Sequence, residues 1–204
     1  MSRYRAPTAE ATAALRDRGS RFFAHVAPAG TAAEAKAFVT EVERRHPGAT
    51  HVVFAWRIGW PAEERAVDAG EPAGSAGAPI LQVLRGAGLS DVCAAVAREF
   101  GGTKLGRGGL ARAYGGAVRD ALVGLPTRER RPRVRLRLVC GHARVGAVKR
   151  LLRAGEVELA GERYGAEAEL ELEVARERES EVAAALGELG VAWERMPARA
   201  ERGP

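Results

Sequence analysis

The sequence contains few of the residues that most often carry metal or redox chemistry. It has two cysteines, Cys93 and Cys140, and each lies in an apolar segment typical of a buried strand. We therefore expect two buried thiols rather than a disulfide or a metal pair. The four histidines, at positions 25, 46, 51 and 142, are scattered along the chain. No metal and no cofactor is expected, and nothing in this inventory indicates an enzyme.

Long hydrophobic runs are also missing. No segment approaches the roughly 18 apolar residues that a membrane-spanning helix needs. The first five residues, which include Arg3 and Arg5, are not followed by the apolar stretch of a secretory signal. We therefore expect a cytoplasmic protein without a membrane partner.

Lysine is scarce, because only three of the 32 basic residues are lysines. The formal net charge is +6, and it is unevenly distributed. Residues 1–128 carry 17 basic and 12 acidic side chains, whereas residues 129–204 carry 15 and 14. A polyanionic partner, RNA or the ribosome, is therefore expected to dock on the first part of the chain.

A break in the apolar pattern indicates two domains. Pro126 and Pro132 enclose a segment of mixed charge that interrupts the hydrophobic pattern. Such segments commonly separate domains. The sequence therefore predicts one domain over residues 1–128 and a second over residues 133–204.

The first part reads as a mixture of strands and helices, and one helix has a clear start at the capping box of Thr31 and Glu34. The predicted elements are strands at 11–18 and 20–26, a helix from 31 to 46, a strand at 50–58, a loop at 59–78, a short helix at 79–84, a strand at 92–98 and a helix at about 109–124.

The second part alternates more regularly. The predicted elements are a strand at 134–140, a helix at 143–153, strands at 157–162 and 168–174, a helix at 177–189 and a strand at 191–196. This βαββαβ order is the ferredoxin-like pattern. The predicted fold class is therefore α+β.

The densest basic run alternates along the first strand of that second part. Its arginines at positions 133, 135 and 137 share one strand face, and glutamates at 167, 169, 171 and 173 alternate in the same way on the third predicted strand. In a ferredoxin-like sheet these strands are antiparallel neighbours, so cross-strand ion pairs are one interpretation. A ladder that binds an RNA backbone is the other.

A glycine-rich basic loop leads into the last helix of the first part. Its residues are Arg98, Gly101, Gly102, Lys104, Gly106, Arg107, Gly108 and Gly109, followed on the helix by Arg112. Glycines allow close backbone approach, and the free N–H groups of a helix start favour anions. The spacing matches neither a Walker A sequence nor a dinucleotide fingerprint. We predict that Lys104, Gly106, Arg107, Gly108, Gly109, Arg112 and Arg98 bind phosphate, with tight turns alone as the plainer explanation of the glycines.

A second glycine-rich loop precedes the short helix. Its candidate residues are Asp68, Glu71, Gly74, Ser75 and Gly77. The acids are interpreted as shaping the loop through hydrogen bonds, with ligand binding or catalysis as alternatives. No base is apparent near Ser75, and Ala73 breaks the G-x-S-x-G pattern of a nucleophile elbow. No catalytic residue is therefore assigned.

Gly115 and Gly116 stand inside the predicted helix, where each glycine costs about 1 kcal/mol relative to alanine. We expect another element to pack closely there, most simply the sheet.

Three blocks together resemble the IMPACT (YigZ-like) family. They are Ser20-Arg21-Phe22, the segment from Gly70 to Pro79, and the segment from Arg98 to Tyr114. Two positions depart from the family pattern: Ala69 replaces one of two usual acids, and Glu99 replaces the usual aromatic after Arg98.

The resemblance implies an N-terminal two-layer α/β domain similar to the fourth domain of elongation factor G. For the bacterial type it also implies a ferredoxin-like C-terminal domain. Members are linked to control of translation, and eukaryotic ones restrain a stress kinase through a partner protein.

The sequence as a whole therefore predicts a non-enzymatic, cytoplasmic factor associated with translation. It would bind RNA or the ribosome through the basic face of the first domain, and a protein partner from the translation machinery is a further possibility. Two other classes remain open: an enzyme or sensor of a small phosphorylated or nucleotide ligand, and a protein-interaction module. The oligomeric state is unknown.

Overall fold

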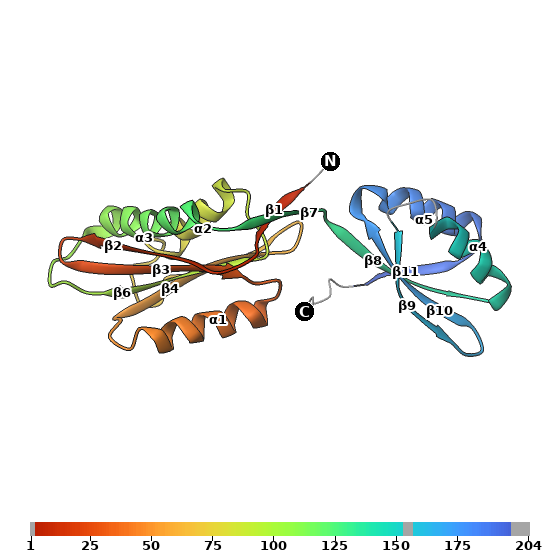
Figure 1. The fold of residues 1–204 in the computed structure, drawn as a ribbon, viewed down its shortest axis with the longest axis horizontal. Helices are drawn as coiled ribbons and strands as arrows, with labels where there is room; N and C mark the ends of the chain where they lie inside the picture. Colours follow the sequence, from red (N-terminus) through yellow and green to blue (C-terminus); the bar gives the residue numbers. More distant parts are fainter. Residues whose placement is uncertain (1–2, 153–156, 197–204) are drawn as a thin grey trace. The chain divides into compact units, whose positions relative to one another are not determined.

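The computed structural model describes residues 3–152 and 157–196, which form two compact units. One unit comprises residues 4–130, and the other comprises the described residues from 131 onward together with Arg3. A five-stranded and a four-stranded sheet, each with helices, make the chain an α+β protein with two domains (Figure 1).

The first unit is built on a five-stranded sheet in which all neighbours are antiparallel. In spatial order its strands are β2 (Ala11–Asp17), β3 (Ser20–Pro28), β6 (Val92–Glu99), β4 (His51–Ile58) and β5 (Glu63–Val67). Strand β5 lies within residues 59–78, where we predicted only a loop, so that prediction was wrong. Its sequence, Glu-Glu-Arg-Ala-Val, is that of an edge strand with no buried residue, and it therefore lacks apolar alternation.

Helices cover both faces of this sheet. Helix α1 (Ala32–Arg45) lies on one face, and α2 (Gly77–Gly86) and α3 (Gly106–Val123) lie on the other (Figure 1). The predicted two-layer arrangement is therefore wrong, since the unit has three layers. Small apolar residues on both sides of β6 explain the difference: Ala94 and Val96 pack with α2 and α3, whereas Cys93, Ala95 and Ala97 pack with α1.

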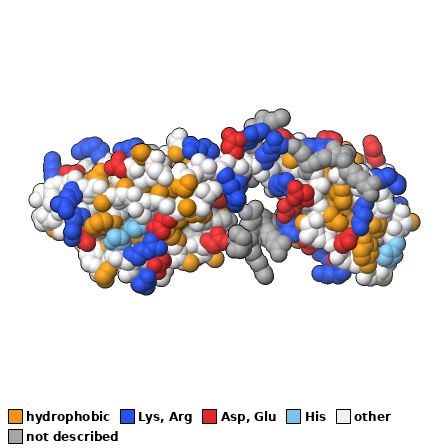
Figure 2. All heavy atoms as spheres, in the orientation of Figure 1, with side chains coloured by type: hydrophobic (Ala, Val, Ile, Leu, Met, Phe, Trp, Pro, Cys, Tyr) orange, Lys and Arg blue, Asp and Glu red, His pale blue; other side chains and the backbone are white. Residues whose placement is uncertain are grey.

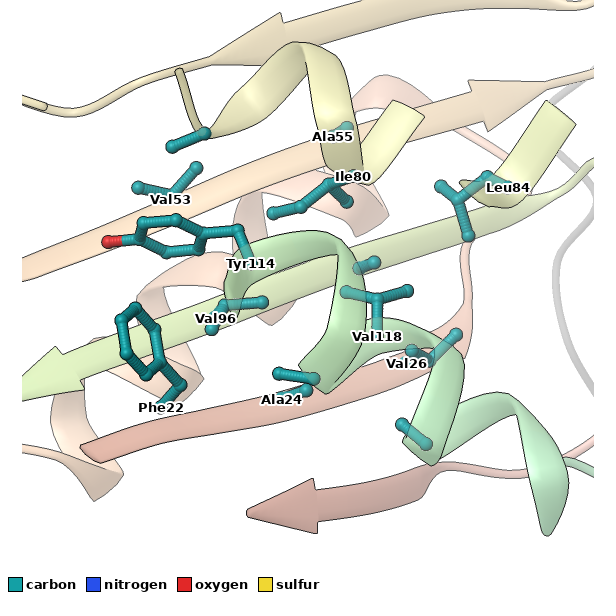
Figure 3. Close-up of a cluster of buried hydrophobic side chains, with 14 of the residues drawn as sticks. Phe22, Ala24, Val26, Val53, Ala55, Ile80, Leu84, Val96, Tyr114 and Val118 are labelled. Carbon is teal, nitrogen blue, oxygen red and sulfur yellow. The ribbon is translucent and has the colours of Figure 1, made fainter. Parts of the chain in front are cut away.

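The larger core lies between the sheet and the pair α2 and α3 (Figure 3). Phe22 from β3 meets the ring of Tyr114 from α3 edge to face, with centroids 5.1 Å apart. Both side chains are fully buried. Because Tyr114 lies near the middle of α3, this contact anchors that helix on the sheet.

A two-stranded ladder that the sequence did not indicate joins the two ends of the first unit. Strand β1 (Tyr4–Pro7) pairs antiparallel with β7 (Thr127–Arg130), inside the segment that we expected to be a linker. The buried carboxylate of Asp91 holds both strands, because it accepts hydrogen bonds from the Tyr4 hydroxyl at 2.7 Å and from Arg130 at 2.9 Å. Strands of four residues carry too little periodicity to be recognised from sequence.

The second unit shows the predicted βαββαβ order. Its elements are β8 (Arg133–Cys140), α4 (His142–Leu152), β9 (Val157–Tyr164), β10 (Ala168–Ala175), the one-turn helix η1 (Arg176–Arg178), α5 (Glu179–Glu188) and β11 (Ala192–Met196). The strands are ordered β11-β8-β10-β9, with every neighbour antiparallel. One face packs against α4 and α5 around a core of leucines and valines (Figure 1).

The other face of this sheet carries the alternating charges. Arg137 pairs with Glu169 at 3.1 Å, and Arg135 pairs with Glu171. Arg133 pairs with Glu158 at 2.8 Å. The predicted cross-strand ion pairs are confirmed, and they neutralise the arginine ladder that would otherwise favour an RNA backbone.

Candidate functional site

The glycine-rich loop runs directly into α3, and the helix begins earlier than predicted. Its first residue is Gly106 rather than Gly109, so Gly106, Gly108 and Gly109 all belong to the first turn. The N-cap residue, Leu105, has no side-chain acceptor, and the first turn contains no acid. Gly106 and Gly108 are exposed. The N–H groups of this turn therefore have no side-chain cap.

Exposed cations surround this helix start. Lys104 lies just before it, and Arg107 and Arg112 lie on its first two turns. Arg107 donates a hydrogen bond to the carbonyl oxygen of Ala73 at 2.6 Å, a neutral acceptor that leaves its charge in place. Within the described part of the chain, Lys104 and Arg112 have neither a hydrogen-bond nor an ion-pair partner. Basic side chains are visible at this end of the first unit and at other places on the same face (Figure 2).

Arg98 has a different environment from these cations. It is 5% exposed, and its guanidinium pairs with the buried carboxylate of Glu71 at 2.7 Å. It also donates to Ser20 Oγ at 3.3 Å. The Tyr114 hydroxyl donates to the same carboxylate at 2.7 Å, and burial, followed by this hydrogen bond, raises the pKa of Tyr114. Arg98 and Glu71 thus form an internal pair that links β6, α3 and the loop before α2.

Asp68 shapes the loop before α2, as its principal interpretation predicted. Its carboxylate accepts hydrogen bonds from the backbone N–H groups of Gly74 at 2.8 Å, Ala76 at 3.0 Å and Gly77 at 2.8 Å. Burial alone would raise the pKa of Asp68, but these three donors outweigh it, so the pKa lies below its usual value. The start of α2 is therefore already occupied by an internal anion.

Ser75 and Gly77 complete that loop. The Ser75 hydroxyl is buried and donates to the carbonyl oxygen of Pro72 at 2.6 Å rather than to a base. Gly77 packs so closely on β5 that a Cβ there would lie 2.7 Å from the backbone nitrogen of Val67. These contacts give both residues structural roles, and they offer no activated nucleophile.

The two glycines inside α3 face different neighbours. A Cβ on Gly116 would lie 3.2 Å from Leu15 of β2, which agrees with the predicted packing on the sheet. A Cβ on Gly115 would instead approach Val83 of α2 at 3.7 Å.

Between α2 and α3 runs a groove of about 760 Å³, and Arg112 and Arg119 line its α3 side.

The structure brings together two histidines that the sequence left scattered. The Nε2 atoms of His25 and His46 lie 2.8 Å apart, and Nδ1 of His25 lies 2.8 Å from a carboxylate oxygen of Glu10. Phe23 stacks on His46, with centroids 4.8 Å apart. The histidines are 21 positions apart, which hides this contact from any local motif, and His46 is the C-cap residue of α1.

Acid should weaken the fold through His46. Burial, followed by the nearby positive charges of His25 and Arg45, lowers the pKa of His46, so the unfolded chain binds a proton there more readily than the folded chain does. The free energy of unfolding should therefore fall as the pH drops below about 6.5. Urea denaturation between pH 5 and 7.5 would measure this, and His46→Asn should flatten the dependence in that window. If the stability of His46→Asn depends on pH as steeply as that of the parent, this prediction is wrong.

Neither a metal centre nor a membrane span emerges from the described residues. They contain no group of three or more His, Cys, Asp and Glu side chains arranged to hold a metal ion. None of their helices combines the length and the apolar character that crossing a membrane requires.

Comparison with known proteins identifies the family. The profile described as the Impact N-terminal domain matches residues 18–122, which is more than half of the chain and includes both glycine-rich loops. The chain belongs to the IMPACT family. A second profile, a domain of unknown function called DUF1949, matches residues 138–190.

Individual IMPACT proteins resemble most of the chain. The IMPACT family member YigZ of Escherichia coli is 38% identical over 155 residues, covering 74% of this chain and 76% of its own length. A solved structure titled only as a hypothetical protein covers 98% of this chain and 100% of its own, at 32% identity and a TM-score of 0.72. A structure of the two-domain translational regulator Yih1 is more distant: it is 28% identical, covers 57% of this chain and 46% of its own, and has a TM-score of 0.40.

Proposed function

We propose that this IMPACT family protein is a non-enzymatic, cytoplasmic factor that binds RNA, as free RNA or in the ribosome, during translation. The contact surface is the start of α3 with Lys104, Arg107 and Arg112. The association with translation follows the role that the family resemblance implies. The RNA contact rests on the geometry of the helix start.

The observation that carries the proposal is the contrast between the starts of α2 and α3. The N–H groups of Ala76 and Gly77 at the start of α2, and that of Gly74 just before it, bond to Asp68, so that site is filled from within the protein. Among the described residues no carboxylate caps the start of α3 in this way, and three exposed cations flank it. Backbone donors and positive charge converging on one exposed point suit a phosphate group.

The fold supports the same interpretation at the level of architecture. We propose that the first unit is similar to the fourth domain of elongation factor G. We propose that residues 133–204 form a separate ferredoxin-like domain similar to that factor's last domain, as the βαββαβ order and the strand order suggest. Both likenesses are analogies of fold and carry no reaction with them.

The triple variant Lys104→Ala, Arg107→Ala, Arg112→Ala should bind RNA more weakly and with less dependence on salt. Each lost phosphate contact should lower the slope of log affinity against log salt by roughly 0.7–0.9. Fluorescence anisotropy with a labelled single-stranded RNA at several salt concentrations measures the slope. Sedimentation with ribosomes tests the same surface on its larger target.

A matched control removes the same charge from the opposite face of the sheet. Lys36, Arg44 and Arg45 all belong to α1, and their replacement by alanine should leave the slope close to that of the parent. If both triple variants behave alike, general charge rather than this surface drives binding. If the parent binds no RNA but micromolar nucleotide stabilises it against heat, the protein is a sensor of a small ligand and not an RNA-binding factor. If the parent neither binds RNA nor is stabilised by nucleotide, the protein is an adaptor that binds other proteins.

A further inference from the structure

An exposed aromatic ring stands at the beginning of the glycine-rich loop. Phe100 is 47% exposed, although it lies only two residues beyond Arg98, the last buried residue of the central strand β6. Single exposed apolar residues are common on protein surfaces. Phe100 differs from such residues in what lies beneath it and beside it.

The ring rests on a fixed charge. The guanidinium carbon of Arg98 lies 5.4 Å from the Phe100 ring centroid, and it also lies 5.5 Å from the ring of Phe22. Arg98 is itself held by the buried carboxylate of Glu71. The Phe100 ring therefore lies against a cation held in place by an ion pair, while about half of the residue's surface remains exposed to solvent.

The backbone around the ring is fixed as well. The N–H group of Phe100 donates to Thr50 Oγ1 at 3.3 Å, and that of Gly101 donates to Ser20 Oγ at 3.2 Å. The loop therefore presents the aromatic face from rigid elements, which lowers the cost of ordering it when a ligand binds.

The proposed phosphate site lies within a few residues of this ring. Lys104 follows Phe100 by four residues, a stretch of chain that spans at most about 14 Å. Arg107 bonds to Ala73, two residues from the Glu71 that holds Arg98. Phe100 and these cations thus belong to the same loop and to the helix start that it leads into.

We propose that Phe100 is a stacking platform for an unpaired nucleobase, and that the preferred ligand is therefore single-stranded or looped RNA rather than a duplex. This rests on the proposed RNA-binding function and specifies its ligand. A base on the outer face of the ring completes a stack of base, phenyl ring and guanidinium, while Lys104 and Arg107 hold the adjoining phosphates. Aromatic platforms beside cationic grooves bind single strands in this way because every base has a π-face, whereas bases inside a duplex are already stacked.

The test compares Phe100→Ala, Phe100→Leu and Phe100→Trp in the 204-residue chain. The probes are a labelled single-stranded RNA and the same strand annealed to its complement. Phe100→Ala and Phe100→Leu should weaken single-strand binding about tenfold or more, with little effect on the duplex. Phe100→Trp should bind within a few fold of the parent. The salt slope should stay unchanged in all three, because no charge is removed.

Val123→Ala serves as the matched control, since Val123 is an 89% exposed apolar residue at the far end of α3. Its single-strand affinity should equal that of the parent. The stacking proposal would be overturned if Phe100→Leu bound the single strand as tightly as Phe100→Trp does. It would also be overturned if Phe100→Ala lost the same affinity for the single strand and for the duplex. The same holds if Phe100→Ala binds the single strand as tightly as the parent does. Failure of the RNA-binding function itself is a different outcome, because then the parent binds neither probe.

Discussion

Replacement of Glu71 by alanine should destabilise the first domain by about 3–5 kcal/mol, the usual cost of leaving one partner of a buried ion pair uncompensated. Without Glu71, the Arg98 guanidinium and the Tyr114 hydroxyl lose their shared acceptor. The Nε atom of Arg98 already has no hydrogen-bond partner among the described residues. Without Glu71, the remaining side-chain hydrogen bond of the guanidinium is the one to Ser20 Oγ at 3.3 Å. Urea denaturation followed by circular dichroism measures the effect.

Two further variants separate the charge from the hydrogen bond. Tyr114→Phe keeps the ion pair and should cost only about 0.5–1.5 kcal/mol. The double variant Glu71→Ala, Arg98→Met removes both charges and should recover much of the loss. A Glu71→Ala protein as stable as Tyr114→Phe would show that Arg98 finds another partner, and the role assigned to this pair would then be wrong.

Gly101→Ala should have a comparably large effect, about 3 kcal/mol, because overpacking here acts on backbone atoms. A Cβ at this position would lie 1.9 Å from the carbonyl carbon of Gly19 and 2.2 Å from the nitrogen of Ser20. The turn between β2 and β3 and the start of the glycine-rich loop would have to separate. The same displacement should weaken RNA binding, since this loop carries Phe100 and Lys104. Thermal denaturation and RNA titration test both expectations.

Gly86→Ala is the matched control. Gly86 lies in the same domain, in α2, and nothing lies within 4 Å of an added Cβ. It should leave stability unchanged or raise it by up to about 1 kcal/mol, as expected for alanine in a helix. If Gly101→Ala melts like Gly86→Ala, the two loops are not packed as tightly as the structure describes.

Local patterns accounted for much of the fold. Thr31 caps α1 as predicted, since it accepts the N–H of Glu34 at 3.1 Å, although the Glu34 carboxylate bonds back to the N–H of Gly30 at 2.8 Å rather than to that of Thr31. The continuous apolar run of β6 predicted a buried strand, and the alternation of arginine with valine and leucine predicted the charged face of β8. Each of these signals lies within one element, where side-chain periodicity reflects burial directly.

The features that escaped prediction depend on contacts between distant residues. Glu71 and Arg98 are 27 positions apart, and nothing near either residue identifies the other as its partner. The placement of α1 on the opposite face of the sheet from α2 and α3 depends on how connections cross the sheet, which apolar periodicity does not encode. The exposure of Phe100 is of the same kind, because it depends on where β6 ends, at Glu99, and on the contacts that the following loop makes with distant residues.

The pairing of β1 with β7 places the two ends of the first domain side by side. Tyr4 and Arg130 are direct partners in that pairing, so the chain begins and finishes this unit at adjacent points. A domain whose ends are neighbours tolerates circular permutation, and it can be inserted into a surface loop of another protein through short linkers. The five-stranded sheet and the glycine-rich loop can therefore be moved together into another protein as one folded domain. The contacts of Asp91 with Tyr4 and Arg130 hold the two ends of that domain together.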